Sequence, residues 1–332
     1  MTDALFLTSD AVDDLATPAD YVAAVREGYR EVGTGAPAEP RTLLPSGDPP
    51  GMLTTYVAML PDIGAMGGYT YSAGFAERDA WFLTPLFDAE TGEPLAIIDG
   101  ASMNPFKTGA AGAVAVDALA RPDASTVAVI GSGPQARGQL RTTATVRDLT
   151  AVRVFSPTPA NRESFADEFA ERLDADVTAV SSASAALAGA DIVITATTAS
   201  EPVIADADVE PGAHVTAMGQ YAADKHELPP ELIARATYVP DLTARATRDA
   251  GSFIAAREAG LVSDDDLEVE LGDVVAGNHP GRTSDDEVTV FDSGGTGIET
   301  VAAAHMLYER AREAGRGTPL SIAPASEALT GL

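Results

Sequence analysis

The stretch Thr126-Val127-Ala128-Val129-Ile130-Gly131-Ser132-Gly133-Pro134-Gln135-Ala136 determines the fold of this chain. An apolar run rich in β-branched residues ends in the pattern G-x-G-x-x-A, and a helical pattern begins at Arg137. Between a strand and a helix this is the dinucleotide fingerprint: Gly131 makes the tight turn, Gly133 lets the backbone approach a pyrophosphate, and Ala136 lets the helix pack on the strand. The helix start offers N–H groups and the positive end of its dipole to the phosphates. A glycine turn between any buried strand and helix can mimic the pattern. The pattern therefore indicates a dinucleotide site only if the neighbouring elements also fit a Rossmann fold.

The sequence after Ser125 alternates between short apolar runs and helical patterns. Helices fit between most of the apolar runs, for example over residues 161–173. This alternation predicts an α/β domain with a parallel, doubly wound sheet of the Rossmann type. Its strands are expected at residues 127–130, 152–155, 176–180, 192–196, 214–218, 237–240 and 288–291.

About 120 residues precede the fingerprint, which is enough for another domain. Strands are expected there at residues 52–57, 68–73, 81–88 and 94–99, and helices at 18–32 and 108–120. A long helix at 297–315 should return to this first domain. The expected organisation is a discontinuous α+β domain, residues 1–120 with 298–332, and a dinucleotide-binding Rossmann domain at residues 121–297.

The composition excludes several kinds of site and location. The chain has no cysteine, which excludes disulfides and thiolate metal sites, and its four histidines lack metal-ligand spacing, so no metal is expected. No apolar run approaches the ~18 residues that a membrane helix needs, so no membrane partner is expected. The N-terminus has no basic region followed by an apolar core and therefore no visible signal peptide. The expected location is the cytoplasm.

The charge is extreme: 50 acidic against 21 basic residues give a net charge of −29 at pH 7. The acids are dispersed along the chain, and only two of the 21 cations are lysine. Self-repulsion of this size destabilises a compact state unless salt screens it, with a Debye length of ~3 Å at 1 M. The pattern is typical of a high-salt cytoplasm such as that of a haloarchaeon; an acidic enzyme of ordinary salt tolerance is the alternative. The same charge disfavours nucleic acid as a partner.

The end of the second Rossmann strand bears on the choice between NAD and NADP. NAD binders usually place an acidic residue there for the ribose 2′-hydroxyl. This chain instead has Ser156 and Thr158, followed by Arg162. Two hydroxyls and an arginine suit a 2′-phosphate better than a free diol, so NADP(H) is favoured over NAD(H). The alternative is that these are ordinary helix-capping residues.

The two lysines provide a second indication of the site. A chain that has otherwise dispensed with lysine should keep it where a compact ammonium is needed. Lys107 opens the alanine-rich helix before the fingerprint, and Lys225 lies just past the fifth Rossmann strand, where the cleft should be. Chance retention of two lysines is the alternative.

These segments together resemble the ornithine cyclodeaminase and μ-crystallin family. The resemblance implies a homodimer whose first domain supplies both dimer contacts and substrate groups. It also implies nicotinamide-dependent redox chemistry at an amino-acid or imine carbon. It covers nearly the whole chain through Pro40-Arg41, the strand pair at 88–99, Lys107-Thr108, the fingerprint at 131–136, Thr195-Ala196-Thr197-Thr198, the loop at 219–228 and Phe291-Asp292-Ser293-Gly294-Gly295.

Family roles can be carried over position by position. Arg41 matches the arginine that grips the substrate carboxylate, which a guanidinium can do bidentately; a surface arginine after a proline is the alternative. Gln135 and Ala136 match the pair that contacts the pyrophosphate, Ser156 the ribose-reading position, and Ser293 the residue near the nicotinamide. The other expected cofactor contacts are Thr108, Gly131, Ser132, Gly133, Pro134, Thr158, Arg162, Thr197, Thr198, Met218, Gly219 and Lys225.

Three departures from the family pattern concern catalysis. Tyr69 stands where the family usually has a catalytic lysine, Lys107 where it has an arginine, and Tyr221 where cyclodeaminases have a catalytic aspartate. Without the lysine and the aspartate the usual acid/base pair is missing. This argues against ornithine cyclodeamination, in which a second amine has to be steered into the imine.

Tyrosine is nevertheless a competent proton donor if a nearby cation lowers its pKa. Tyr69, Tyr71 and Tyr221, with Lys107 and Arg41 for charge, can form a different acid/base set around a carbonyl or imine. The alternative is that the tyrosines simply pack against the nicotinamide pocket. His226 either touches the cofactor or faces solvent.

The expected function is that of an NAD(P)-dependent oxidoreductase acting on a small carboxylate-bearing imine, 2-oxo acid or amino acid, of the imine reductase or amino-acid dehydrogenase type. Arg41 and Lys107 would bind the carboxylate, and Tyr69 or Tyr221 would exchange the proton. The alternatives are ornithine cyclodeaminase itself and a non-catalytic NADP(H)-binding protein.

Overall fold

The computed structural model describes residues 2–75 and 79–330 of the chain. The chain divides into two compact units: residues 1–107 with 296–332 form unit 1, and residues 108–295 form unit 2. Unit 1 is thus discontinuous in sequence, because the segment after residue 295 belongs to it. Among the described residues, no helix combines the length and the hydropathy needed to cross a membrane.

The first unit boundary lies inside helix α3 (Asn104–Leu119), earlier than the expected position at residue 120. The first turn of α3 packs within unit 1, where Phe106 stacks on Tyr21 with a ring-centroid distance of 5.4 Å. The rest of α3 packs within unit 2 against α4 (Pro134–Thr143), where a Cβ on Gly109 would lie 2.6 Å from the carbonyl oxygen of Gly138. One helix therefore belongs to both units.

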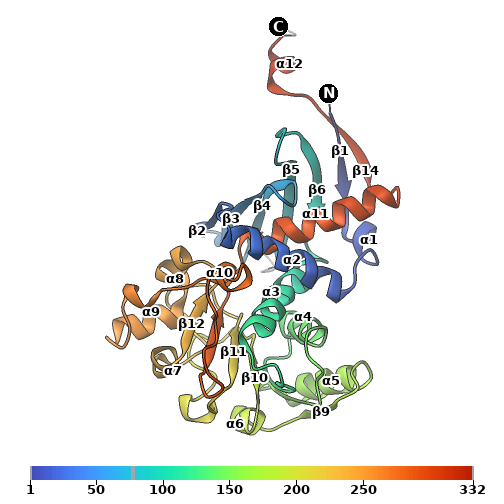
Figure 1. The fold of residues 1–332 in the computed structure, drawn as a ribbon. Helices are drawn as coiled ribbons and strands as arrows, with labels where there is room; N and C mark the ends of the chain where they lie inside the picture. Colours follow the sequence, from blue (N-terminus) through green and yellow to red (C-terminus); the bar gives the residue numbers. More distant parts are fainter. Residues whose placement is uncertain (1, 76–78, 331–332) are drawn as a thin grey trace. The chain divides into compact units, whose positions relative to one another are not determined.

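Unit 2 is built on a parallel, doubly wound sheet of seven strands (Figure 1). Their order across the sheet is β12-β13-β11-β10-β7-β8-β9, and each strand is parallel to its neighbours. The last strand in sequence, β13, is inserted between β11 and β12. The strand bounds are β7 (Thr126–Ile130), β8 (Ala151–Phe155), β9 (Asp176–Ala179), β10 (Ile192–Thr195), β11 (His214–Ala217), β12 (Thr237–Pro240) and β13 (Thr289–Asp292).

Two hydrophobic clusters lie on opposite faces of the unit 2 sheet, and strand β7 contributes to both. Ala128 and Ile130 of β7 belong to one cluster, and Val127 and Val129 belong to the other. Both faces of the sheet are therefore buried, which explains why its strands read as continuous apolar runs. The other helices of unit 2 are α5 (Pro159–Ala170), α6 (Ala183–Leu187), α7 (Pro230–Arg235), α8 (Thr243–Asp249), α9 (Gly251–Glu258) and α10 (Leu271–Val275).

Unit 1 contains a second seven-stranded sheet, in the order β14-β1-β6-β5-β4-β3-β2. All neighbours are antiparallel except β1 and β6. The sequence predicted four of these strands but missed β1, β2 and β14. The bounds are β1 (Thr2–Leu7), β2 (Ala38–Gly47), β3 (Pro50–Leu60), β4 (Ala65–Ala73), β5 (Ala80–Asp88), β6 (Pro94–Asp99) and β14 (Thr318–Ile322).

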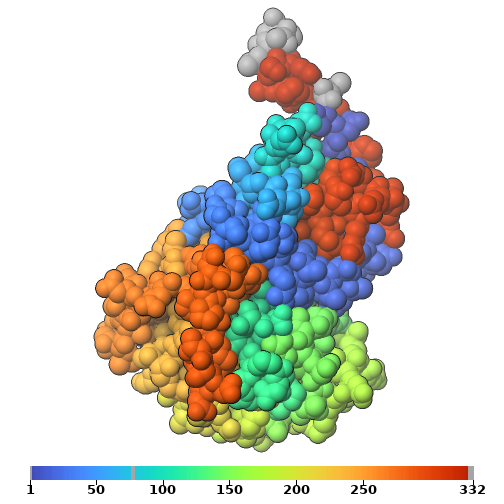
Figure 2. Space-filling view, in the orientation of Figure 1, coloured from blue at the N-terminus to red at the C-terminus, as the bar shows by residue number. Residues whose placement is uncertain are grey.

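Two long helices, α2 (Pro18–Gly33) and α11 (Gly297–Glu313), cover one face of this sheet. Figure 2 shows α11 in red beside α2 in blue. The helices approach closely at Gly28, where a Cβ would lie 3.1 Å from the Cβ of Ala302. Short helices α1 (Ser9–Val12) and α12 (Ala325–Thr330) complete the unit.

The two faces of the unit 1 sheet differ in burial. Along β3, Tyr56 and Ala58 are buried beneath the helices, whereas Val57 is 46% and Met59 38% exposed. This alternation is the period of two that a strand imposes on its side chains. The face without helices carries a row of exposed apolar side chains, and the helix-covered face holds the polar cluster described below.

Candidate functional site

The fingerprint loop of unit 2 has the backbone geometry that the sequence predicts. Gly131 has a φ of +120°, and a Cβ there would lie 2.3 Å from the carbonyl oxygen of Ala196. Gly133 is the N-cap of α4 and makes no side-chain cap, and Pro134 follows as the first helical residue. Ala136 is fully buried against the sheet.

This loop fits the pyrophosphate of a dinucleotide. The N-terminal N–H groups of α4 have no capping side chain, so they can donate to phosphate oxygens. A Cβ added to Gly133 would meet no atom within 4 Å, so the space beside this backbone is open. The side-chain oxygen of Gln135 is buried and has no hydrogen-bond partner among the described residues, and it is the second group here able to bind a ligand.

The end of β8 lies beside the fingerprint loop. The hydroxyls of Ser132 and Ser156 are 3.0 Å apart, and Ser156 is 6% exposed. Arg162 donates from Nη1 to the carbonyl of Ser156 at 2.9 Å, and its guanidinium lies 5.8 Å from the ring of Phe155. Thr158 is the N-cap of α5, but its side chain makes no capping hydrogen bond. Capping by Thr158 therefore does not account for this group of residues.

The loops after β10 and β11 are joined by a buried carboxylate that the sequence did not single out. Glu227 is 2% exposed and accepts the N–H groups of Thr197 and Gly219, each at 2.7 Å, and the hydroxyl of Thr195 at 3.1 Å. Burial raises the pKa of Glu227, and these hydrogen bonds oppose the shift. Met218, buried nearby, donates its N–H to the carbonyl of Thr195 at 2.9 Å.

A second buried network holds the residues after β13. Arg245 is fully buried and donates to Asp241 and to Asp292, the latter at 2.7 Å from Nη2. The other oxygen of Asp241 accepts the N–H of Gly294 at 2.9 Å and the hydroxyl of Ser293 at 3.3 Å. Ser293, the position expected near the nicotinamide, is therefore held by Asp241, which follows β12, and Asp241 is in turn bound by Arg245 on α8.

The remaining residues of unit 2 that the sequence predicts to contact the cofactor differ in how exposed they are. Thr108 accepts a hydrogen bond at its carbonyl from Gln139 Nε2 at 2.9 Å. Thr198 and Lys225 are exposed, and Tyr221 is half-buried. His226 is also half-buried. The rare lysine at 225 therefore lies on an exposed loop, while the other lysine is deeply buried.

The helix-covered face of the unit 1 sheet gathers two cations and four aromatic rings. Its cations are Arg41 on β2, which is 4% exposed, and Lys107 on α3, which is 1% exposed. Arg41 Nη1 lies 3.4 Å from the hydroxyl of Tyr71, and Lys107 Nζ lies 4.8 Å from the centre of the Tyr69 ring. The rings belong to Tyr56, Tyr69, Tyr71 and Phe82, with neighbouring centroids 5.1 to 6.4 Å apart.

Lys107 also makes a buried ion pair within this cluster. Its ammonium lies 3.2 Å from Oε1 of Glu299 and 3.4 Å from the hydroxyl of Tyr56. The same Oε1 accepts the N–H of Thr296 at 2.7 Å, because Thr296 and Glu299 form the capping box of α11. Glu299 thus neutralises Lys107 within the cluster.

The electrostatics of Tyr69 differ from the expectation for a proton donor. Its side chain is 1% exposed and its hydroxyl donates to the carbonyl of Gly100 at 3.3 Å. Burial raises the pKa of Tyr69 well above the usual value for tyrosine. The nearby ammonium of Lys107 does not reverse this increase in pKa. Tyr69 is therefore a neutral phenol whose hydroxyl hydrogen is engaged in a hydrogen bond to the backbone.

Arg41, Tyr69, Tyr71 and Lys107 are therefore brought together in unit 1, while the expected dinucleotide contacts and Tyr221 belong to unit 2. Sequence reasoning missed Tyr56 and Glu299. Tyr56 alternates with exposed residues in a strand and reads as core. Glu299 reads as the last residue of a T-x-x-E capping box, a signal that does not reveal its second partner.

Comparisons of this chain with protein families, with curated proteins and with solved structures agree with one another. The model of the ornithine cyclodeaminase/mu-crystallin family matches residues 3–315. A Delta(1)-pyrroline-2-carboxylate reductase of Bacillus cereus is 37% identical over 70% of this chain and 71% of its own length. The Thermococcus litoralis Delta(1)-pyrroline-2-carboxylate reductase, solved with NADH and L-proline, has a TM-score of 0.90 at 30% identity and covers 95% of this chain and 100% of its own. An archaeal alanine dehydrogenase dimer with bound NAD has a TM-score of 0.90 at 29% identity, with 97% and 100% coverage.

Proposed function

Because the chain belongs to the ornithine cyclodeaminase/mu-crystallin family and is an NAD(P)-dependent oxidoreductase, we propose that it reduces a small cyclic imine bearing a carboxylate beside the C=N bond. The observation that carries this proposal is the buried Arg41 among tyrosines, in a chain whose dinucleotide loop fits a pyrophosphate. The similar Bacillus cereus and Thermococcus litoralis enzymes, both named for a pyrroline carboxylate, support the substrate class.

The reaction adds a hydride to the imine carbon and a proton to the imine nitrogen. When bound, the reduced nicotinamide supplies the hydride. Arg41 grips the substrate carboxylate with two parallel hydrogen bonds, which fixes the ring. Lys107, which is paired with Glu299, holds its ammonium beside the ring of Tyr69, and the rings of Tyr56, Tyr69 and Tyr71 form a wall that excludes water from the imine.

Tyr221 is the better of the two proposed proton donors. Tyr69 has its hydroxyl engaged with Gly100 and a raised pKa, which makes it a weaker acid. Tyr221 is half-buried and lies on the loop after β11, which also carries the expected cofactor contacts Met218 and Gly219.

A screen of purified protein in molar KCl tests the proposal. NADPH and NADH oxidation are followed by absorbance with Δ1-pyrroline-2-carboxylate, with pyruvate plus ammonium, and with no substrate; L-ornithine is assayed separately for proline formation. We expect turnover with the imine. Proline formation from ornithine would instead establish a cyclodeaminase, and tight cofactor binding with no turnover of any substrate would establish a non-catalytic binding protein.

We propose NADP(H) as the preferred cofactor. Ser132, Ser156 and Arg162 surround the end of β8, where an acidic residue would repel a 2′-phosphate. The solved complexes of similar proteins contain NADH or NAD, so the preference needs a direct measurement. We expect NADPH to bind more tightly, and S156D to shift the preference towards NADH. A tenfold preference of the unaltered protein for NADH, ~1.4 kcal/mol, contradicts this.

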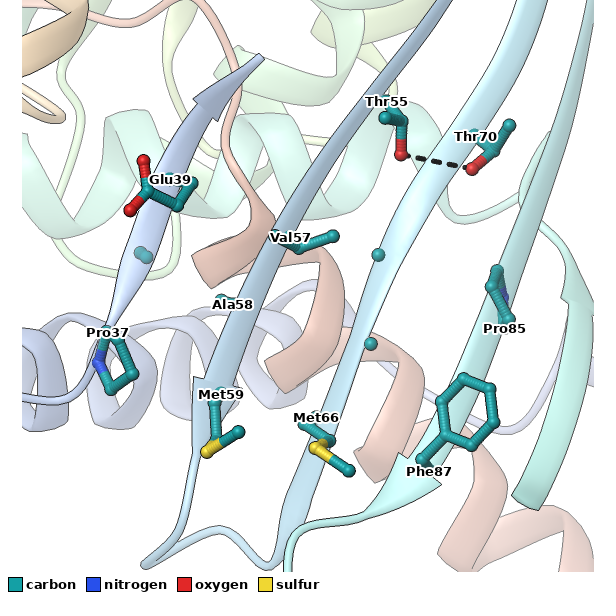
Figure 3. A pocket seen from close by; sticks show the side chains of 13 residues that line it. Pro37, Glu39, Thr55, Val57, Ala58, Met59, Met66, Thr70, Pro85 and Phe87 are labelled. Carbon is teal, nitrogen blue, oxygen red and sulfur yellow. Dashed lines mark hydrogen bonds between the residues drawn. The ribbon is translucent and has the colours of Figure 1, made fainter. Parts of the chain in front are cut away.

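We also propose that a second copy of the chain covers the helix-free face of the unit 1 sheet. Figure 3 shows Met59, Met66 and Phe87 on three adjacent strands of this face, which carries a hollow of about 410 Å³. Among the described residues that line it, Glu39 alone has a charged side chain. Exposed leucines, Trp81 at 75% and Val57 at 46% extend the apolar surface, which is unusual on a chain of net charge −29.

Light scattering tests the dimer. We expect a dimer in molar KCl and a monomer for V57E, which places a charge in the middle of the apolar face. D3N, a change at a charged residue on β1, serves as the control and should remain dimeric. A monomer for the unaltered chain, or a dimer for V57E, contradicts this use of the face.

A further inference from the structure

Glu227 binds three groups at the cofactor edge, which is the edge of the unit 2 sheet where the parallel strands end. The three groups come from the end of β10 and from the loops after β10 and β11. Thr195 ends β10, Thr197 lies in the loop after it, and Gly219 lies in the loop after β11. All three partners are hydrogen-bond donors, and the two N–H groups bind different oxygens of the carboxylate. A carboxylate is the side-chain group that can accept from all of them without presenting a hydrogen of its own.

Glu227 is itself held in place. Its backbone carbonyl accepts the N–H of Val203 at 2.9 Å, and Leu228 next to it is fully buried. The backbone that carries this carboxylate is therefore fixed by its own contacts. The loops that the carboxylate binds carry the expected cofactor contacts at positions 197, 198, 218 and 219.

The absence of a side chain at Gly219 is part of the same arrangement. A Cβ there would lie 2.4 Å from the carbonyl oxygen of Thr197 and 2.5 Å from Oε2 of Glu227. Gln220 adds a bond from Nε2 to the same Thr197 carbonyl at 3.0 Å. The carbonyl of Ala196 in turn occupies the place of a Cβ on Gly131. The fingerprint turn and both loops thus form one continuous packed edge.

We infer that Glu227 is a positioning residue for the dinucleotide: its buried carboxylate sets the conformation of the loops after β10 and β11 and thereby the affinity for the cofactor. It acts through these loops and does not touch the cofactor. The inference rests on the proposed nicotinamide site, but it does not depend on the substrate.

The test compares E227Q with a matched control in the full-length chain in molar KCl. In E227Q the amide would turn an N–H group towards at least one donor, so a loop must move. Glu287 provides the control, because it also accepts backbone N–H groups, from Thr283 and Ser284, and precedes β13 at the opposite edge of the sheet. Both variants lose a structural carboxylate of unit 2.

We expect E227Q to raise the dissociation constant for NADPH or NADH, whichever the unaltered chain prefers, at least tenfold, and E287Q to leave it within twofold. Hydrogen exchange of the cofactor-free protein should show faster exchange in peptides covering 196–199 and 218–220 for E227Q alone. If E227Q binds within twofold of the unaltered chain, or if E287Q weakens binding equally, the inference is wrong.

Two further features keep the outcomes distinct. Gly219→Ala disturbs the contact between Glu227 and the Gly219 backbone by placing a methyl group against the carboxylate. It should therefore reproduce the loss of cofactor affinity, and it tests the inference if E227Q does not fold. An unaltered chain that binds no dinucleotide would overturn the proposed function, whereas unchanged exchange in E227Q would overturn the role of Glu227 independently.

Discussion

Arg41 is the buried guanidinium of the unit 1 cluster, and it lies beside the hydroxyl of Tyr71. An ammonium in its place keeps the charge but loses the planar fork that binds a carboxylate twice. We therefore expect R41K to raise the KM for the imine about tenfold, ~1.4 kcal/mol, with a smaller change in kcat. Steady-state kinetics in molar KCl measure both constants.

Arg30 provides the control for that substitution. It lies on the surface of unit 1, where it pairs with Glu27 and Asp62. R30K should leave the KM unchanged, because exposed pairs of this kind contribute little. An unchanged KM in R41K would remove Arg41 from substrate binding.

The two candidate proton donors can be separated by removing one hydroxyl at a time. Y221F should lower kcat about 100-fold, the size expected for loss of a general acid. Y69F should change kcat less than about threefold, because the raised pKa of Tyr69 keeps its phenol neutral and its hydroxyl bonded to Gly100. The same pKa direction means that Tyr69 adds no limb to the pH–rate profile between pH 6 and 10. The reverse ranking of the two variants would assign the donor to Tyr69.

At the level of single residues, the sequence predicted which side chains gather in unit 1, but it did not predict which other side chains contact them. Arg41, Tyr69, Tyr71 and Lys107 do gather in one cluster, yet nothing in the sequence indicates that a glutamate almost 200 positions away neutralises Lys107. Such a contact depends on tertiary packing, and the capping box at the start of α11 already explains a glutamate at position 299 locally.

The elements around the fingerprint contain two glycines that should respond differently to alanine. A Cβ on Gly133 meets no atom within 4 Å, whereas one on Gly109 meets the backbone of Gly138 at 2.6 Å. We expect G133A to keep its thermal midpoint but to weaken cofactor binding at least tenfold, because the methyl group fills space that the pyrophosphate needs.

G109A should show the opposite behaviour. The methyl group forces α3 away from α4, an overpacking that costs ~1–3 kcal/mol. Its thermal midpoint should fall by several degrees. Calorimetry and cofactor titration of both variants give the comparison, and a G133A protein with unaltered affinity would argue against a phosphate at the start of α4.

The strands and helices with strong periodicity were predictable from the sequence. All seven strands of the unit 2 sheet lie within a few residues of their expected positions, because both faces are buried and their runs are apolar. β1, β2 and β14 were missed. Most of β2 is exposed, and β14 pairs with β1, the first strand of the chain, so neither local pattern predicts a strand. The insertion of β13 between β11 and β12 is a property of the fold and leaves no local signal.

At the scale of the whole molecule, the net charge of −29 predicts a dependence on salt. Screening by KCl reduces repulsion among the dispersed acids, so stability should increase with ionic strength. We expect the thermal midpoint to rise by more than ~5 °C between 0.1 M and 2 M KCl. Equal midpoints at the two concentrations would show that the acidic composition is unrelated to salt.

The chain passes between its two units at residues 107/108 and 295/296, and one carboxylate oxygen contacts the unit 1 residue at each crossing. Oε1 of Glu299 binds the ammonium of Lys107 and the N–H of Thr296. The two cut ends of unit 1 are therefore already neighbours, so a linker of a few residues, each spanning at most about 3.5 Å, can join them. The same segment of a relative can therefore replace residues 108–295, provided that the replacement continues helix α3 from position 108.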